Sequence, residues 1–171
     1  LDLRSAKEVL EFLTVFADRC HHGKEEECLF PKLVERGLPL QVGPVAVMLA
    51  EHTQGRAEIA GMRAAVSEWE RGDKQACERF VERANAYVLL LREHISKENE
   101  VLFPMADGML GEVEQAALLA AFARVETHDL GEGTHERYLA LAEDLVQRLG
   151  VKPAQLGFAR AGCCGHLRGC H

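Results

Sequence analysis

The chain has 171 residues, which suits one domain with a single core. Apolar residues make up 47% of it and aromatic residues 6%, and the frequent Leu, Ala, Glu and Arg indicate helices. The net charge of -7 argues against a nucleic-acid-binding protein and against binding to anionic membranes, because both need a basic surface. The longest apolar run, at 116–123, is too short to span a bilayer.

The predicted elements are five helices, recognised by apolar residues at helical spacing between capping and stop signals. In chain order they span about 6–36, about 44–70, about 74–106, from Gly111 to about Thr127, and Thr134 to Leu149. Ser5 and Glu8 form a predicted capping box for the first helix, and Asp73 is the predicted cap of the third. Short loops favour antiparallel neighbours, so we predict an all-α up-down bundle over 1–150 and a loosely structured tail over 151–171.

An internal repeat relates the first predicted helix to the third. The sequence at 19–31 is RCHHGKEEECLFP, and at 92–104, a constant offset of 73, it is REHISKENEVLFP. Each copy has a histidine and a glutamate four residues apart, His21 with Glu25 and His94 with Glu98, on one helix face. A single such pair is usually a surface ion pair, but two in register on facing helices predict a metal site for iron, manganese or zinc.

A Leu-Phe-Pro sequence follows each histidine–glutamate pair and ends at Pro31 and Pro104. A proline inside a helix costs about 3 kcal/mol. Its occurrence twice at one register suggests an imposed local geometry near the pairs. For the Leu-Phe-Pro residues themselves we expect a packing and kink element near the helix end.

Three further residues are candidates beside the pairs. His52 lies on the apolar face of the second helix and is the expected third imidazole, although alone it would more often be a satisfied core histidine. His22 lies about 100° around the helix from His21 and faces either a metal coordination position or a neighbouring helix. Tyr87, two turns before His94, either packs in the core or borders the metal cavity.

The repeat also predicts a second histidine equivalent to His52. His52 precedes His94 by 42 residues, so the corresponding mate of His21 would lie about 21 positions before residue 1. We therefore expect a further ligand-bearing helix upstream of this sequence. The alternative is that His128, His135 or a swapped partner chain fills that place.

These motifs resemble the bacterial branch of the hemerythrin-like HHE cation-binding domains over about residues 5–107. The resemblance rests on FADRCHHGKEE at 16–26, AEHTQGR at 50–56 and the second histidine–glutamate pair with its Leu-Phe-Pro at 94–104. It implies a hemerythrin-like bundle, here with extra C-terminal helices, that holds two non-haem iron ions, with zinc or manganese as substitutes. It also implies that Glu25 and Glu98 bridge the ions and that the other ligands are His21, His52 and His94.

The predicted function is to bind or sense oxygen, nitric oxide, redox state or iron. The alternative is an enzyme that turns over peroxide or nitric oxide, and whether the chain is an enzyme is left open. Oxygen carriers of the family have two histidines one turn apart where this chain has His52 and Arg56, so reversible oxygen carriage is not predicted. The expected partner is a small diatomic ligand or peroxide, with a homodimer as one candidate assembly and no nucleic acid or membrane.

The cysteines bear on the cellular compartment and on the tail. Six cysteines, at positions 20, 28, 77, 163, 164 and 170, follow no disulfide framework, which favours a reducing cytoplasm. The tail combines Cys, His and Gly but lacks a paired C-x-x-C spacing, so no metal site is predicted there.

Overall fold

A computed structural model describes residues 1–131 and 133–151, with the side chains of 128–130 outside this description. Within these ranges all regular structure is helical, and no helix is long and apolar enough to cross a membrane. The segments marked η are π-helical. In chain order the elements are α1 (Leu3–Phe12), η1 (Leu13–His22), η2 (Glu25–Leu29), α2 (Phe30–Glu35), α3 (Pro44–Glu70), α4 (Ala76–Lys97), η3 (Glu98–Leu102), α5 (Phe103–Met109), α6 (Glu112–Arg124), η4 (Val125–Leu130) and α7 (Thr134–Arg148).

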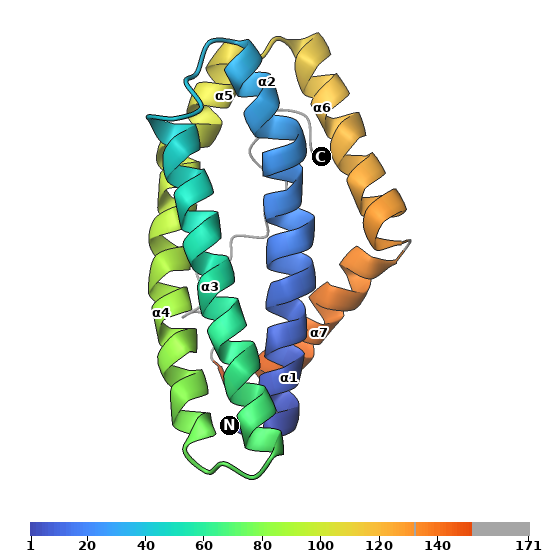
Figure 1. Ribbon diagram of the computed structural model, residues 1–171. Helices are drawn as coiled ribbons and strands as arrows, with labels where there is room; N and C mark the ends of the chain where they lie inside the picture. The colour runs from blue at the N-terminus through green and yellow to red at the C-terminus, as the bar shows by residue number, and fades with distance from the viewer. Residues whose placement is uncertain (132, 152–171) are drawn as a thin grey trace.

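Three long antiparallel helices form the main body (Figure 1). The first runs without a break from α1 through η1 and η2 to α2, the second is α3, and the third runs from α4 through η3 to α5. The prediction of an all-α bundle is confirmed. The predicted tail at 151–171 lies, apart from its first residue, outside the described residues.

The predicted capping box at Ser5 is wrong. The first helix begins at Leu3, and the carboxylate of Asp2 accepts hydrogen bonds from the backbone N–H and the hydroxyl of Ser5, each at 2.9 Å. Asp and Ser are equally good N-caps, and the earlier start adds one helical turn whose Leu3 packs against the core. The third helix begins at Ala76 rather than 74, and Asp73 belongs to the turn before it.

The π-helical geometry recurs at one register in both halves of the repeat. Segments η2 and η3 begin at Glu25 and Glu98, and the N–H groups of Phe30 and Phe103 donate to the carbonyl oxygens of these glutamates, five residues earlier. A proline without an N–H follows each phenylalanine. The wider turn therefore accommodates the proline at the end of each metal-site segment, and the expected local geometry is present in both.

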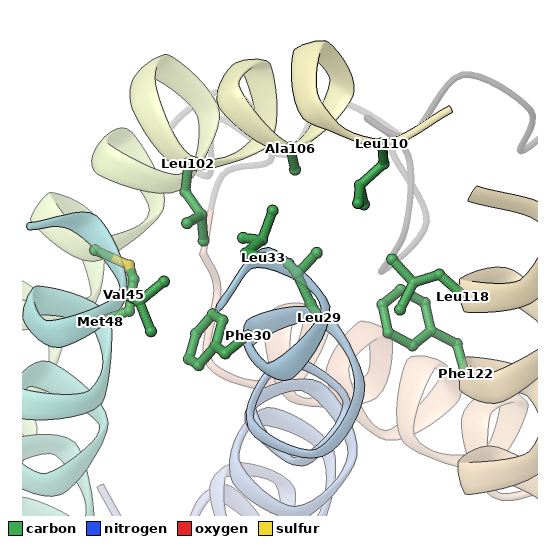
Figure 2. Packing of buried hydrophobic residues seen from close by; sticks show 10 residues of the cluster. All are labelled: Leu29, Phe30, Leu33, Val45, Met48, Leu102, Ala106, Leu110, Leu118 and Phe122. Atoms are coloured by element: carbon green, nitrogen blue, oxygen red, sulfur yellow. The ribbon is translucent and has the colours of Figure 1, made fainter. Parts of the chain in front are cut away.

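The three long helices pack against one another through two apolar clusters, one toward each end of the bundle. Figure 2 shows the cluster around Leu29 and Leu102, where Val45 of α3 and Phe122 of α6 also contribute. The other cluster contains Met62 and lies toward the opposite end of α3. Between them the helices bury polar side chains instead.

The C-terminal helices α6 and α7 form an elbow beside the first helix, on the side away from α3 and α4 (Figure 1). Lys24 of the first helix, although only 2% exposed, forms an ion pair with Glu126 of η4. Its Nζ atom also lies 6.0 Å from the centre of the Phe122 ring. This buried cation therefore adds to the more exposed ion pairs between the elbow and the first helix, such as Arg36 with Glu114 and Arg148 with Glu8.

Candidate metal centre

Buried histidines and glutamates meet between the two apolar clusters. Two overlapping groups have ligand atoms within 4.8 Å of one another, and all members are buried. The groups are His22, His52 and His94, and Glu25, His52, His94 and Glu98. The structure therefore brings together five of the six predicted ligands.

The two shared histidines point their Nε2 atoms at each other and at the glutamates. The two Nε2 atoms of His52 and His94 are 3.2 Å apart. His52 Nε2 lies 3.2 Å from Glu25 Oε2, and His94 Nε2 lies 2.8 Å from Glu98 Oε1. The first helix, α3 and the third helix each contribute to this contact.

The opposite ring nitrogens of these histidines contact carboxylates. His52 Nδ1 lies 2.7 Å from Glu26 Oε1, and His94 Nδ1 lies 3.0 Å from Glu51 Oε2. An ionised carboxylate can only accept a hydrogen bond. We therefore assign the ring proton of each neutral histidine to Nδ1, which leaves the lone pair on Nε2. This is the usual arrangement of metal-binding histidines.

The inward-facing atoms are acceptors that lack donors. Four buried atoms of this cluster have no hydrogen-bond partner: His22 Nε2, both carboxylate oxygens of Glu25, and Glu98 Oε1. Buried acceptors facing one another are unfavourable unless a cation lies among them. Imidazole nitrogens and carboxylate oxygens are the donor set that suits iron, manganese or zinc, so these residues fit the predicted metal.

His22 belongs to the same cluster by its packing. Its ring stacks on that of His52, with centroids 3.9 Å apart and an interplanar angle of 15°. Its Nδ1 lies 3.4 Å from Asp18 Oδ1. Burial, with the neighbouring histidines, lowers the pKa of His22 to about 4 despite Asp18, so the ring is neutral at neutral pH.

His21 lies at the edge of the cluster. Its Nε2 is 3.6 Å from Glu98 Oε1 and 3.9 Å from Glu25 Oε1, and its side chain is 25% exposed. It therefore faces the same two glutamates as the buried histidines but remains accessible to solvent.

The two glutamates have opposite pKa shifts. Burial raises the pKa of Glu25. Burial also acts to raise the pKa of Glu98, but the imidazoles of His21 and His94 outweigh it and lower that pKa. Burial thus disfavours the charged form of Glu25, and a bound cation would favour the charged form of both carboxyl groups.

Arg56 and Lys97 neutralise the outer carboxylates. Arg56 Nε lies 2.7 Å from Asp18 Oδ1 and Arg56 Nη2 lies 2.8 Å from Glu26 Oε1. Lys97 forms an ion pair with Glu51. Sequence reasoning correctly excluded Arg56 as a ligand but did not find this outer role.

Two of the outer carboxylates, Asp18 and Glu51, were not among the predicted site residues. Asp18 stands four residues before His22, which is the same i,i+4 signal that identified the histidine–glutamate pairs. Glu51 directly precedes His52 and gives no such signal, because its partners lie on another helix. The third outer carboxylate, Glu26, directly follows Glu25 and contacts His52.

Tyr87 both packs in the core and borders a cavity beside the cluster, the two alternatives that its sequence position suggested. It is 3% exposed within an apolar cluster, and it also borders a cavity of about 10 Å³ next to His22, His52 and His94. Its hydroxyl is buried without a hydrogen-bond partner, and burial, with nearby Asp18, raises the pKa of Tyr87 to about 12. The hydroxyl therefore stays protonated beside the cluster.

The C-terminal histidines have different outcomes. His135 stacks on Phe16 with ring centroids 5.4 Å apart and is not part of the ligand cluster. The side chain of His128 lies outside the described residues. The expected helix upstream of residue 1 stays a prediction.

Comparisons with known proteins agree with this geometry. The family model "Hemerythrin HHE cation binding domain" matches residues 2–106. "Uncharacterized protein Rv1995" of Mycobacterium tuberculosis is 24% identical over 144 residues, covering 84% of this chain and 56% of that protein. "Iron-sulfur cluster repair protein YtfE" of Salmonella newport is 36% identical over 90 residues, covering 50% of this chain and 40% of that protein. The chain thus spans about half the length of these relatives, and no solved structure matches it.

Proposed function

Because the chain belongs to the hemerythrin HHE cation-binding family, we propose that its metal site holds two non-haem iron ions between Glu25 and Glu98. The observation that carries this proposal is the buried cluster itself. The Nε2 atoms of His52 and His94 lie 3.2 Å apart, and the carboxylates of Glu25 and Glu98 beside them hold buried oxygens without a hydrogen-bond partner. Three imidazoles together with the two glutamates provide donors for a pair of ions.

The proposed roles follow the positions of the side chains. Glu25 and Glu98 would hold both ions, with His52 and His94 as ligands from the buried side and His21 as a ligand from the exposed side. When bound, iron supplies a redox couple and coordination positions for small molecules. The outer carboxylates keep the ring nitrogens oriented, and the apolar clusters at both ends exclude water.

We propose that the protein binds or senses oxygen, nitric oxide, redox state or iron level. The size of the neighbouring cavity supports a small ligand, since about 10 Å³ is roughly the space that one water occupies. Tyr87 places a protonated hydroxyl at that cavity, where it can donate to a ligand.

A second candidate is a role in iron–sulfur cluster repair, or turnover of peroxide or nitric oxide. It is favoured by the similarity to the Salmonella repair protein over half of this chain. The exposed edge at His21 would give a larger reaction partner access to the site. Stoichiometric binding of nitric oxide without turnover would favour the sensor. Peroxide consumption that Glu98→Ala abolishes, or transfer of iron to a cluster-depleted protein, would favour the second candidate.

Metal analysis tests the proposed site directly. Protein expressed with iron should contain about two irons per chain and absorb as a non-haem ferric centre. His94→Ala should lose most of this iron while its circular dichroism stays helical, because the apolar clusters remain. His135→Ala is the matched control and should keep its iron, since His135 lies outside the cluster. Colourless, iron-free protein, or unchanged iron in His94→Ala, would contradict the proposal.

A further inference from the structure

We propose that the two metal positions are unequal. At the buried position His22 is a ligand together with His52 and His94, and this position retains its ion. The position beside His21 exchanges its ion with solvent. This inference rests on the proposed two-metal function. It assigns a third imidazole to one ion and predicts different behaviour for the two.

The first support is the state of His22 itself. The residue is 4% exposed, and its Nε2 is buried without a hydrogen-bond partner. One ring nitrogen of His22 lies within 4.8 Å of ring nitrogens of both His52 and His94. The Nδ1 atom of His22 contacts Asp18, as the Nδ1 atom of His52 contacts Glu26. His22 thus resembles His52 in having an outer carboxylate at Nδ1, and its Nε2 is left without a hydrogen-bond partner.

The second support comes from the internal repeat. Ile95 occupies the position equivalent to His22, at the offset of 73, and Ile95 is 41% exposed. At this position of the repeat, a polar residue is therefore buried in one half and an apolar residue is exposed in the other. Polar side chains are usually exposed and apolar ones buried, so this is the reverse of the usual pattern. Burial of His22 needs a compensating interaction, and a metal ion at its unpartnered Nε2 supplies one.

The third support is the difference in surroundings. The side chains of His22, His52 and His94 are at most 5% exposed, whereas that of His21 is 25% exposed. Each of the three buried rings has a carboxylate at Nδ1, and His21 has no such contact among the described residues. Outer carboxylates strengthen histidine ligands, so the buried position has both more imidazoles and better support.

Exchange with solvent should follow the same difference. An ion at the buried position can leave only after several packed side chains move. An ion beside His21 has solvent at one side, where a chelator or an incoming ligand can replace its coordination. We expect at least a tenfold difference in the rate at which the two ions are removed.

Chelator removal from the full chain tests the inequality. Protein loaded with two Co²⁺ or two Fe²⁺ ions without oxygen is exposed to a chelator, and metal per chain is followed over time. We expect one ion to leave at least about tenfold faster than the other. His21→Ala should bind a single, slowly removed ion. His22→Ile, which installs the residue found at the equivalent position of the repeat, should lose the slow phase.

Asp18→Asn provides a milder test that leaves His22 in place. It should speed removal of the slow ion by about 10- to 100-fold, the usual effect of losing an outer partner, and leave the fast ion unchanged. His135→Ala is the control, and circular dichroism checks folding. Removal of both ions at one rate, or a slow phase that survives both His22→Ile and Asp18→Asn, would overturn the inequality but keep the two-metal function. Failure to bind any metal would overturn both.

Discussion

Two of the buried histidines depend on a single cation, the guanidinium of Arg56. Arg56 contacts Asp18 and Glu26 at once, and these carboxylates in turn contact His22 and His52. The guanidinium keeps both carboxylates charged, since it helps to lower the pKa of each below its usual value although burial acts to raise it. Ring orientation in the metal site therefore depends on a residue that never touches the metal.

Substitution of Arg56 should weaken metal binding without unfolding the chain. In Arg56→Met two carboxylates lose their shared cation, so the imidazoles beside them lose their fixed orientation. We expect metal affinity to fall by about 10- to 100-fold in a chelator competition assay. Helicity should persist because the Arg56 side chain is 40% exposed. Arg63→Met, two turns further along α3, removes only a contact to Thr14 and should leave the affinity unchanged; an equal loss in both variants would argue against the outer role.

Among individual residues, the sequence predicted the members of the buried cluster better than it predicted the carboxylates that surround them. The i,i+4 spacing placed Glu25 near His21 and Glu98 near His94 because one helix fixes both side chains. Glu51 reaches His94 across two helices, and that contact depends on the axial register of α3 against α4, which no local pattern specifies.

The π-helical segments are the distinctive feature at the scale of elements. Segments η2 and η3 begin at Glu25 and Glu98, respectively, and each ends just before Phe-Pro. A regular helix would bring the proline ring against the carbonyl oxygen four residues earlier. The wider π-helical turn relieves this clash, and such turns are frequent at functional sites.

Replacement of Pro31 by alanine should therefore change stability little. In a regular helix interior the exchange would stabilise by about 3 kcal/mol. Here the clash is already relieved, so we expect a gain below about 1 kcal/mol, the value of one hydrogen bond at most. Urea unfolding of the metal-free protein measures this, and Pro104→Ala should behave alike. A gain near 3 kcal/mol in either variant would mean that the proline is strained.

Helix ends were predicted less well than helix cores. The α3 helix agrees with its prediction because Pro44 and Gly72 are unambiguous signals. The first helix starts earlier than predicted because Asp2 and Ser5 are both good caps, and only packing of the extra turn chooses between them.

For the whole molecule, the main feature is how the C-terminal elbow packs against the three long helices. In the repeat Lys24 and Lys97 are equivalent, and each forms an ion pair with a glutamate of the helix packed beside it, Glu126 and Glu51 respectively. The sequence predicted the extra helices but not where they pack, because Lys24 could have paired with any nearby acid.

Loss of this lysine should loosen the elbow alone. In Lys24→Met, Glu126 loses its cation, but its side chain is 34% exposed and can be hydrated, so we expect a cost of about 1–2 kcal/mol. Amide hydrogen exchange in α6 and η4 should then speed up about tenfold, while α3 and α4 stay protected. Lys97→Met is the matched control and should leave α6 unchanged. Uniform protection in Lys24→Met would show that the apolar contacts of α6 are sufficient.

The placement of buried acceptors between two apolar clusters has a mechanical consequence. Apolar contacts hold the bundle near both ends, while buried polar atoms without hydrogen-bond partners lie across its middle. An ion held by ligands from all three helices would link them at mid-length, where the apolar clusters do not reach. We therefore expect metal binding to slow amide hydrogen exchange on all three helices, including residues that do not touch the ion.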